Sequence, residues 1–418
     1  MSHADPAPMT PLHSNTASRP GSLQRVCATV ALFLLPFPAL NFGVSFTLAD
    51  VFLVTAVLLN ATRWVGLQAF QVPFLMALPL FVISTLLDPD GGLIELVQVL
   101  YIWGFVLPFG WTAFTGLSIR RIVTIVLASA VTNAMVGVGQ GAGYLPELGN
   151  QHIIDVGGGF SRGAGLSLKC NSLVMSLTPC ILLIPLLGRM LTRIATLLAV
   201  ILGLLAAVSK ALIFAVPGIL WYLWHEPCRR QVATLLVALG LGWAVAFDGA
   251  TGVVDIWYHF GDLVSKRWDK LENSIDERVE LIHISLGYAP EALLLGYGPA
   301  GTHVRVSAMT TNTVHVYYLG VILAGGLPAG MLTFLGMGMI VVGLWRGGGR
   351  HVALYVVVHL LALSVMTALL VSFQALPFLV GGAVLARLNS APAPKAQRDV
   401  LSDSPMVSDW SLDWTGQP

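Results

Sequence analysis

Charge is scarce in this sequence. Charged residues make up 10% of the 418 residues, whereas hydrophobic residues make up 56%. A soluble domain carries about 25% charged residues, so the composition excludes an ordinary soluble globular protein and indicates a chain that lies mainly in lipid. The 22 basic and 21 acidic residues nearly cancel. The sequence therefore lacks both the basic surplus of a nucleic-acid-binding protein and the acidic tail of a solvating segment.

Cysteine is also rare. The four cysteines are Cys27, Cys170, Cys180 and Cys228, and no two of them have CxxC spacing. This arrangement supports neither a disulfide framework nor a cysteine-based metal site. We therefore expect a protein without a bound metal or another cofactor.

Long apolar runs, by contrast, are abundant. A helix that crosses a bilayer needs about 20 mostly apolar residues, which predicts an all-α integral membrane protein with about eleven or twelve spans. The predicted spans are 24–40, 45–61, 65–87, 93–115, 121–143, 171–188, 193–209, 211–225, 231–248, 315–344, 352–370 and 372–388.

Basic residues predict the orientation of these spans. With a cytoplasmic N-terminus, the short loops that carry arginine all face the cytoplasm, as the positive-inside rule requires. Both termini are then cytoplasmic. The predicted organisation is a disordered tail over 1–22, nine spans over 23–248 with an outward loop at 144–170, a large outward loop at 249–314, the last spans over 315–388 and a second disordered tail over 389–418.

The outward loops carry the remaining basic residues, against the insertion bias. The first loop contains a glycine-rich run from Gly157 to Gly165, with Arg162 inside it. Glycine allows a backbone to approach a bulky ligand closely, although such a run also fits a flexible interfacial turn.

The large outward loop contains an apolar pattern with steps of three and four, which predicts an amphipathic helix with its apolar face toward the membrane domain. Its stripe consists of Trp268, Leu271, Ile275, Val279, Ile282 and Leu286. Arg267 and Arg278 project from nearly one face, either into a cleft or into solvent beside acidic neighbours. After a tight turn at 295–301, His315 opens the tenth span, where it is either a general base or an interfacial anchor.

Four of the polar residues within the predicted spans are of particular interest. Asp50 and Glu95 lie near outward ends, where Lys210 is a candidate partner for either acid. The alternative is that both acids simply lie at the water interface. Asn133 and Gln140 on the fifth span are expected to hold helices together.

Several of these pieces, taken in order, resemble one known family. They resemble the bacterial O-antigen ligases and surface-polysaccharide polymerases over roughly residues 120–345. The similar segments are Arg162-x-x-Gly165 followed by Asn171, the pair Ser209-Lys210, and Arg278 followed by the turn Leu295-Gly296-Tyr297-Gly298 and His315. Two positions differ from the family pattern. Val316 stands where the family usually has asparagine, and Lys210 stands where it has arginine.

The resemblance implies a metal-independent, inverting glycosyltransferase of the bacterial inner membrane with its active site facing the periplasm. The implied donor is a glycan linked to undecaprenyl diphosphate, and the implied acceptor is a hydroxyl of lipid A-core or of a growing polysaccharide. His315 is the implied catalytic base. Arg162, Lys210 and Arg278 are the implied diphosphate-binding residues. Asp50, Glu95, Asn171, Ser209 and Arg267 are expected to support them.

Two other functions fit the same sequence. One is a transporter or a flippase of lipid-linked glycans, although we find no internal repeat of the kind many transporters show. The other is a non-catalytic membrane partner in polysaccharide assembly, with a degenerate motif at Lys210 and Val316. The sequence does not distinguish a ligase from a polymerase.

Overall fold

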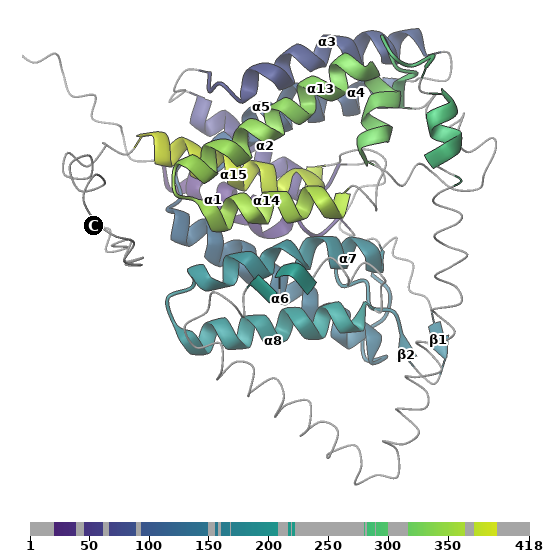
Figure 1. Ribbon diagram of the computed structural model, residues 1–418. Helices are drawn as coiled ribbons and strands as arrows, with labels where there is room; N and C mark the ends of the chain where they lie inside the picture. The colour runs from purple at the N-terminus through teal and green to yellow at the C-terminus, as the bar shows by residue number, and fades with distance from the viewer. Residues whose placement is uncertain are drawn as a thin grey trace, which may run out of the picture.

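The protein is described by a computed structural model. It covers residues 21–38, 46–61, 67–88, 93–148, 155–157, 160–167, 169–207, 216–218, 220–221, 280, 282–288, 290–299, 317–363 and 372–390. Most of these residues are helical, and most of the helices run side by side along one direction (Figure 1). The predicted all-α class is confirmed at this level. Most of both predicted tails lies outside the described residues. The exceptions are Gly21, Ser22, which already begins the first helix, and residues 389–390, which still belong to the last helix.

The first half of the chain follows the first five predicted spans. Its elements are α1 (Ser22–Leu34), α2 (Leu48–Asn60), α3 (Gln71–Leu87), α4 (Leu93–Tyr101), η2 (Ile102–Val106), α5 (Leu107–Phe109), η3 (Gly110–Phe114) and α6 (Ile119–Gly141). The run from α4 to η3 is one long helix with a π-helical turn at η2. Pro108 lies just after this turn and has no backbone N–H to donate, which accounts for the irregular hydrogen bonding there.

The second half contains two short strands that the sequence did not predict. Its elements are β1 (Asp155–Gly157), β2 (Phe160–Ser161), α7 (Cys170–Leu177), η4 (Pro179–Leu186), α8 (Met190–Ala206), α13 (Tyr317–Arg346), α14 (Arg350–Leu363), η6 (Ser372–Ala375) and α15 (Leu376–Ser390). The strands pair antiparallel within the glycine-rich loop that is predicted to face outward. The predicted span 231–248 and most of 211–225 lie outside the described residues.

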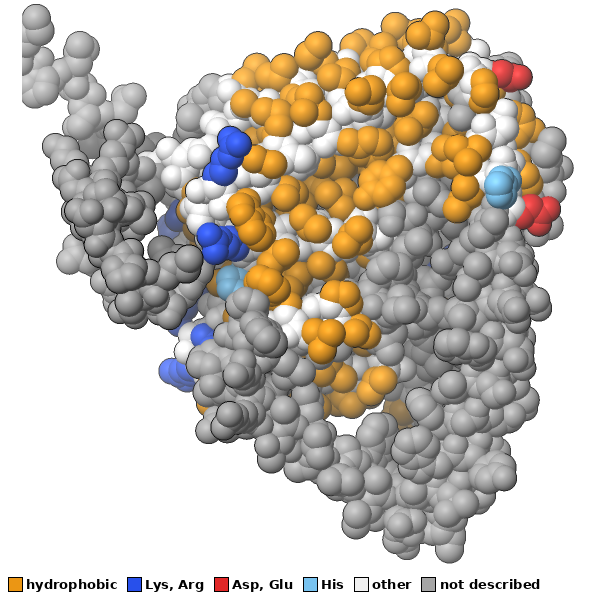
Figure 2. All heavy atoms as spheres, in the orientation of Figure 1, with side chains coloured by type: hydrophobic (Ala, Val, Ile, Leu, Met, Phe, Trp, Pro, Cys, Tyr) orange, Lys and Arg blue, Asp and Glu red, His pale blue; other side chains and the backbone are white. Residues whose placement is uncertain are grey.

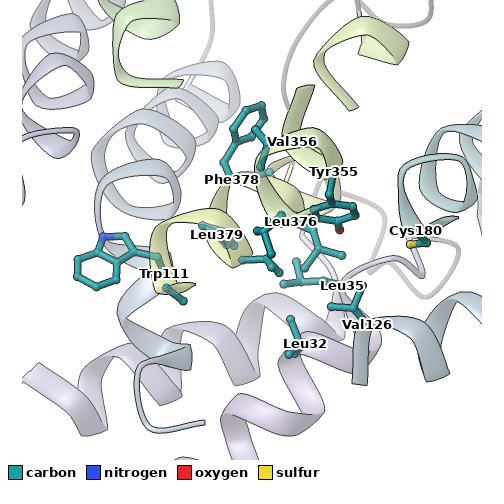
Figure 3. Close-up of a cluster of buried hydrophobic side chains, with 14 of the residues drawn as sticks. Leu32, Leu35, Trp111, Val126, Cys180, Tyr355, Val356, Leu376, Phe378 and Leu379 are labelled. Atoms are coloured by element: carbon teal, nitrogen blue, oxygen red, sulfur yellow. The ribbon is translucent and has the colours of Figure 1, made fainter. Parts of the chain in front are cut away.

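The core lies where helices from both halves meet. Figure 3 shows part of one cluster of buried side chains, which come from α1, η3, α6, η4, α14 and α15. The labelled members are Leu32, Leu35, Trp111, Val126, Cys180, Tyr355, Val356, Leu376, Phe378 and Leu379. Because these helices are far apart in sequence, the described parts of both halves form one packed helical body.

The outside of this body is apolar as well. Large hydrophobic side chains are exposed on α3, α4 and α13, among them Leu87 at 68%, Leu93 at 77% and Met331 at 62%. An exposed apolar surface of this extent indicates contact with lipid rather than water. Among the described residues, three helical runs are long and apolar enough to cross a membrane, namely 93–114, α6 and α13, while the other apolar helices there have 10–17 residues.

Charge is separated along the bundle. Every aspartate and glutamate among the described residues lies in a loop predicted to face outward or near the outward end of a predicted span. The described basic residues belong to segments predicted to face the cytoplasm, apart from Arg162 and Lys169. On the face in Figure 2, basic side chains gather at one end, acidic side chains at the other, and an apolar band lies between them. This distribution agrees with the predicted alternation of the spans.

Helix ends predicted to share a side of the membrane do meet. At the predicted cytoplasmic side, the Asn60 side chain at the end of α2 donates to the carbonyl of Thr112 (2.8 Å) and the hydroxyl of Thr115 (3.1 Å). The guanidinium of Arg387 near the end of α15 donates to the carbonyl of Thr115 (3.2 Å). These bonds join the ends of three helices at one corner.

Candidate functional site

The structure describes four of the predicted site residues: Asp50, Glu95, Arg162 and Asn171. The predicted base His315, the predicted cations Lys210 and Arg278, and the supporting residues Ser209 and Arg267 lie outside the described residues. The site is therefore built here from Arg162 outward and from the turn that precedes His315 in the sequence.

Arg162 is anchored to the C-terminal end of α8. Its Nε donates to the carbonyl of Ala207 (3.3 Å), and the next residue, Gly163, donates its N–H to the carbonyl of Ala206 (3.0 Å). A cation at the free carbonyls of a helix C-terminus is electrostatically favourable. Within the described part of the chain, the two terminal amino groups of this guanidinium make no hydrogen bond.

The turn after Arg162 rests on α6. The side-chain oxygen of Gln140 accepts from the backbone N–H groups of Ala164 (3.0 Å) and Gly165 (2.8 Å). The side-chain oxygen of Asn133 accepts from the N–H of Leu166 (2.6 Å). Buried backbone amides need such partners when no regular ladder supplies them.

The two glycines of this turn explain why it lies so close to α6. A Cβ on Gly163 would lie 2.0 Å from the carbonyl oxygen of Gly137, and one on Gly165 would lie 2.2 Å from Oδ1 of Asn133. Gly165 also has a positive φ of 64°, which glycine adopts without strain. The close approach inferred from the glycine run is therefore found at these two positions, where its partner is α6.

Asn133 and Gln140 are thus site residues that the sequence interpretation missed. We expected them to hold helices together, and the hydrogen bond from Asn133 to Ser176 of α7 (3.2 Å) does so. Their main contacts, however, are with the turn. Their spacing of seven residues, about two helical turns, places both on one face of α6. This spacing, next to a glycine-rich loop predicted to face outward, is the feature of the sequence that could have indicated their contact with the turn.

Asp50 is a buried helix-capping residue. Its carboxylate accepts from the N–H and hydroxyl of Thr47 (2.6 and 2.7 Å), which forms the capping box of α2, and from the hydroxyl of Tyr101 (2.6 Å). Its side chain is 0% exposed. The Asp50 carboxylate is therefore shielded from solvent, and its burial is compatible with the several hydrogen bonds that it receives.

Glu95 and Asn171 differ from Asp50 in exposure. Glu95 lies in the first turn of α4 and is partly exposed. Asn171 lies in the first turn of α7 and is also partly exposed, and its Oδ1 is 3.8 Å from the sulfur of Cys170. The side chains that bind the backbone amides of the Arg162 turn at positions 164–166 are those of Asn133 and Gln140.

The turn before His315 is inserted into a broken helix. Within α13, Gly326 has a non-helical backbone (φ 83°, ψ 166°) and Pro328 follows it. The N–H of Leu327 donates to the carbonyl of Leu293 (3.0 Å), and the carbonyl of Leu323 accepts from the N–H of Tyr297 (2.7 Å). The loop therefore satisfies the donor and the acceptor that the break separates.

This break corrects the predicted tenth span. The part from 327 to 346, about 20 residues and about 30 Å long, is sufficient to cross the bilayer core. The part from 317 to 325 is a separate short helix, which lies across the end of the bundle in Figure 1 (light green). The rings of Tyr317 and Tyr318 pack against Phe334, with centroids 6.2 and 5.1 Å apart. The helix that follows His315 is therefore not the spanning helix itself.

The predicted amphipathic helix is described only at its end. Residues 282–288 are helical. There Leu286 is 50% exposed whereas Ser285 is 0% exposed. Ala292, just after this helix, packs with Leu323 of the short helix in α13. Four of the six stripe residues lie outside the described residues, so the direction of the apolar face stays a prediction.

The two glycine-containing turns lie at the same end of the bundle. In Figure 1, β2, which directly precedes Arg162, and the green helix at 282–288 both lie at the end opposite the label for the C-terminus. A Cβ on Gly298 would lie 2.7 Å from Oδ2 of Asp88 at the end of α3, which fixes the second turn at the same side. Within the described ranges, no group of three His, Cys, Asp or Glu side chains is placed to hold a metal ion.

Comparison of the chain with models of known protein families, and with curated proteins, finds no match.

Proposed function

We propose that this protein is a membrane glycosyltransferase of the O-antigen ligase or polysaccharide polymerase kind. It transfers a glycan from undecaprenyl diphosphate to a hydroxyl of lipid A-core or of a growing polysaccharide. The reaction takes place at the periplasmic face of the bacterial inner membrane, and both termini lie in the cytoplasm.

The diphosphate leaving group determines the chemistry that the site needs. Negative charge on the phosphate grows as the bond between the sugar and the phosphate breaks, and fixed cations stabilise it. In this proposal Arg162, Lys210 and Arg278 supply those cations from three outward segments. Arginine suits the role because its planar fork binds phosphate oxygens in pairs.

His315 is the proposed general base. The acceptor oxygen attacks the anomeric carbon from the side opposite the diphosphate, so the configuration inverts. The hydroxyl proton passes to the imidazole, and undecaprenyl diphosphate leaves with the bonding electrons. A positioned general base contributes about 10²- to 10⁴-fold, so alignment of the two lipid-borne reactants supplies much of the remaining acceleration.

One observation carries the proposal. The guanidinium of Arg162 is held at the C-terminal end of α8 with its terminal amino groups unbound by described residues. Its anchor, Ala207, precedes the Ser209-Lys210 pair by two residues in the sequence. Arg162 is therefore in direct contact with the residue three positions before Lys210 in the sequence.

The test is transfer of a lipid-linked glycan by purified protein in vesicles. His315→Ala is expected to abolish transfer, and Arg162→Ala and Arg278→Ala are each expected to reduce it about 10²-fold. Arg305→Ala is the matched control, because Arg305 lies in the same outward loop as Arg278 and belongs to no proposed site. Lys210→Arg is expected to retain transfer. Equal damage from Arg305→Ala would refute the cation assignment.

The surface glycans of a deletion strain separate the two enzymes. Loss of long chains from lipopolysaccharide, with accumulation of lipid-linked polymer, indicates a ligase. Single repeat units, or missing exopolysaccharide, indicate a polymerase.

The broken helix α13 favours a second candidate, a transporter or flippase, because discontinuous helices line transport sites in many carriers. In this protein the part after the break is long enough to span the bilayer by itself, which favours the enzyme. Flux of a lipid-linked glycan across proteoliposomes without any acceptor would support the transporter.

A further inference from the structure

Four consecutive backbone amides follow Arg162, and all of them are held from outside their own segment. Gly163 donates to the carbonyl of Ala206. The next three amides, at positions 164–166, donate to the side chains of Gln140 and Asn133. A segment without regular secondary structure takes its shape from such partners. The turn is therefore shaped by α6 and α8.

The carboxamides of Asn133 and Gln140 each accept hydrogen bonds through the oxygen and donate hydrogen bonds through the nitrogen. Gln140 accepts two amides of the turn and donates its Nε2 to the carbonyl of Pro146 (3.3 Å). Asn133 accepts the third and donates its Nδ2 to the hydroxyls of Ser167 (3.3 Å) and Ser176 (3.2 Å). Both side chains are buried, at 1% and 0% exposure. Only a carboxamide combines an acceptor with two donors in this way.

We infer that Asn133 and Gln140 are positioning residues for Arg162: they fix the turn so that the guanidinium faces the diphosphate of the lipid-linked donor. This inference rests on the proposed function. Arg162 immediately precedes the held amides, so a shift of the turn moves its backbone as well. A misplacement of about 1 Å can cost about 10²-fold in a reaction that depends on alignment.

The experiment measures binding of undecaprenyl diphosphate to the purified full-length protein in detergent. Asn133→Ala and Gln140→Ala are each expected to weaken binding about tenfold. In an Arg162→Ala background the same changes are expected to have less than about a twofold effect, because residues that act through one another are non-additive. A merely structural role would weaken binding equally in both backgrounds.

Matched controls exist elsewhere in the bundle. Asn60→Ala and Gln24→Ala remove buried carboxamides of the same kinds, which bind carbonyls of Thr112 and Ala113 and do not touch the turn. Both are expected to bind undecaprenyl diphosphate within about twofold of the wild type. If Gln140→Ala fails to fold, Gln140→Met keeps most of the volume, removes both polar atoms and is expected to show the same tenfold loss.

Two failures can be told apart. If Arg162→Ala binds undecaprenyl diphosphate as tightly as the wild type, the diphosphate assignment is wrong and the inference is wrong with it. If Arg162→Ala binds weakly but Asn133→Ala and Gln140→Ala bind normally, only the positioning inference is overturned. The same holds if their losses persist without Arg162.

Discussion

Two turns at the same end of the protein are docked on helices in different ways. The Arg162 turn, residues 163–167, is bound mainly by the side chains of Asn133 and Gln140. The second turn, residues 293–298, is bound by backbone groups that the break at Gly326 leaves open in α13. The difference teaches that the first turn depends on the identity of two side chains, whereas the second depends on the path of the backbone.

The largest expected effect tests the backbone-bound turn. Gly326→Ala places a Cβ 2.5 Å from the carbonyl oxygen of Leu294 at a φ of 83°. Backbone strain and overpacking together predict a loss of about 3–5 kcal/mol in the free energy of unfolding. Unfolding in mixed detergent measures it. The control is Gly338→Ala in the same helix, where no atom lies within 4 Å of the added Cβ. A comparable loss of stability in Gly338→Ala would contradict the explanation by strain and overpacking at Gly326.

The next effect tests the side-chain-bound turn. Asn133→Ala leaves the N–H of Leu166 without its acceptor, and an unsatisfied amide of this kind predicts a loss of about 2 kcal/mol. Hydrogen exchange should show faster exchange at residues 164–167, with the middle of α6 still protected. Asn60→Ala is expected to cost a similar amount of stability without changing exchange at these residues. Unchanged exchange in Asn133→Ala would contradict the side-chain account.

The sequence was sufficient for the membrane class and for most helix positions, because length and hydropathy alone determine which segments can lie in lipid. It did not predict the break in α13. Glycine and proline are common in membrane helices, so the segment Gly325-Gly326-Leu327-Pro328 alone does not indicate a break. The break depends on the loop at 293–297, whose backbone groups replace the missing hydrogen bonds of the helix.

The candidate site was predictable to a smaller extent. Arg162 stands out because a basic residue in a loop predicted to face outward opposes the insertion bias. The role of Gln140 does not stand out, because its hydrogen bonds to the N–H groups of Ala164 and Gly165 form only when that distant turn packs against α6. Asp50 shows the same limit. Its capping box with Thr47 is local, but its burial depends on Tyr101 from another helix.

A smaller effect is expected at Gly348, where backbone strain is present without a steric clash. Gly348 has a φ of 84°, close to that of Gly326, but no atom lies within 4 Å of a Cβ built there. Gly348→Ala therefore keeps the strain and removes the clash, which predicts a loss of about 1 kcal/mol in the same unfolding assay. If it cost as much as Gly326→Ala, the packing of the second turn against the break would contribute little, and strain alone would explain both variants.

The smallest effect tests whether the second turn needs side chains at all. The hydroxyl of Tyr297 donates to the carbonyl of Tyr288 (3.1 Å) or to Oε2 of Glu291 (2.8 Å). Tyr297→Phe removes these bonds and leaves the bond from its N–H to Leu323 intact. We expect a loss of about 0.5 kcal/mol, because a partly exposed hydroxyl and its acceptors exchange their partners for water. The free energies of unfolding of Tyr297→Phe and Asn133→Ala, measured in the same assay, give the comparison. If Tyr297→Phe proved as costly as Asn133→Ala, the second turn would also depend on side chains, and the difference between the two turns would be one of degree.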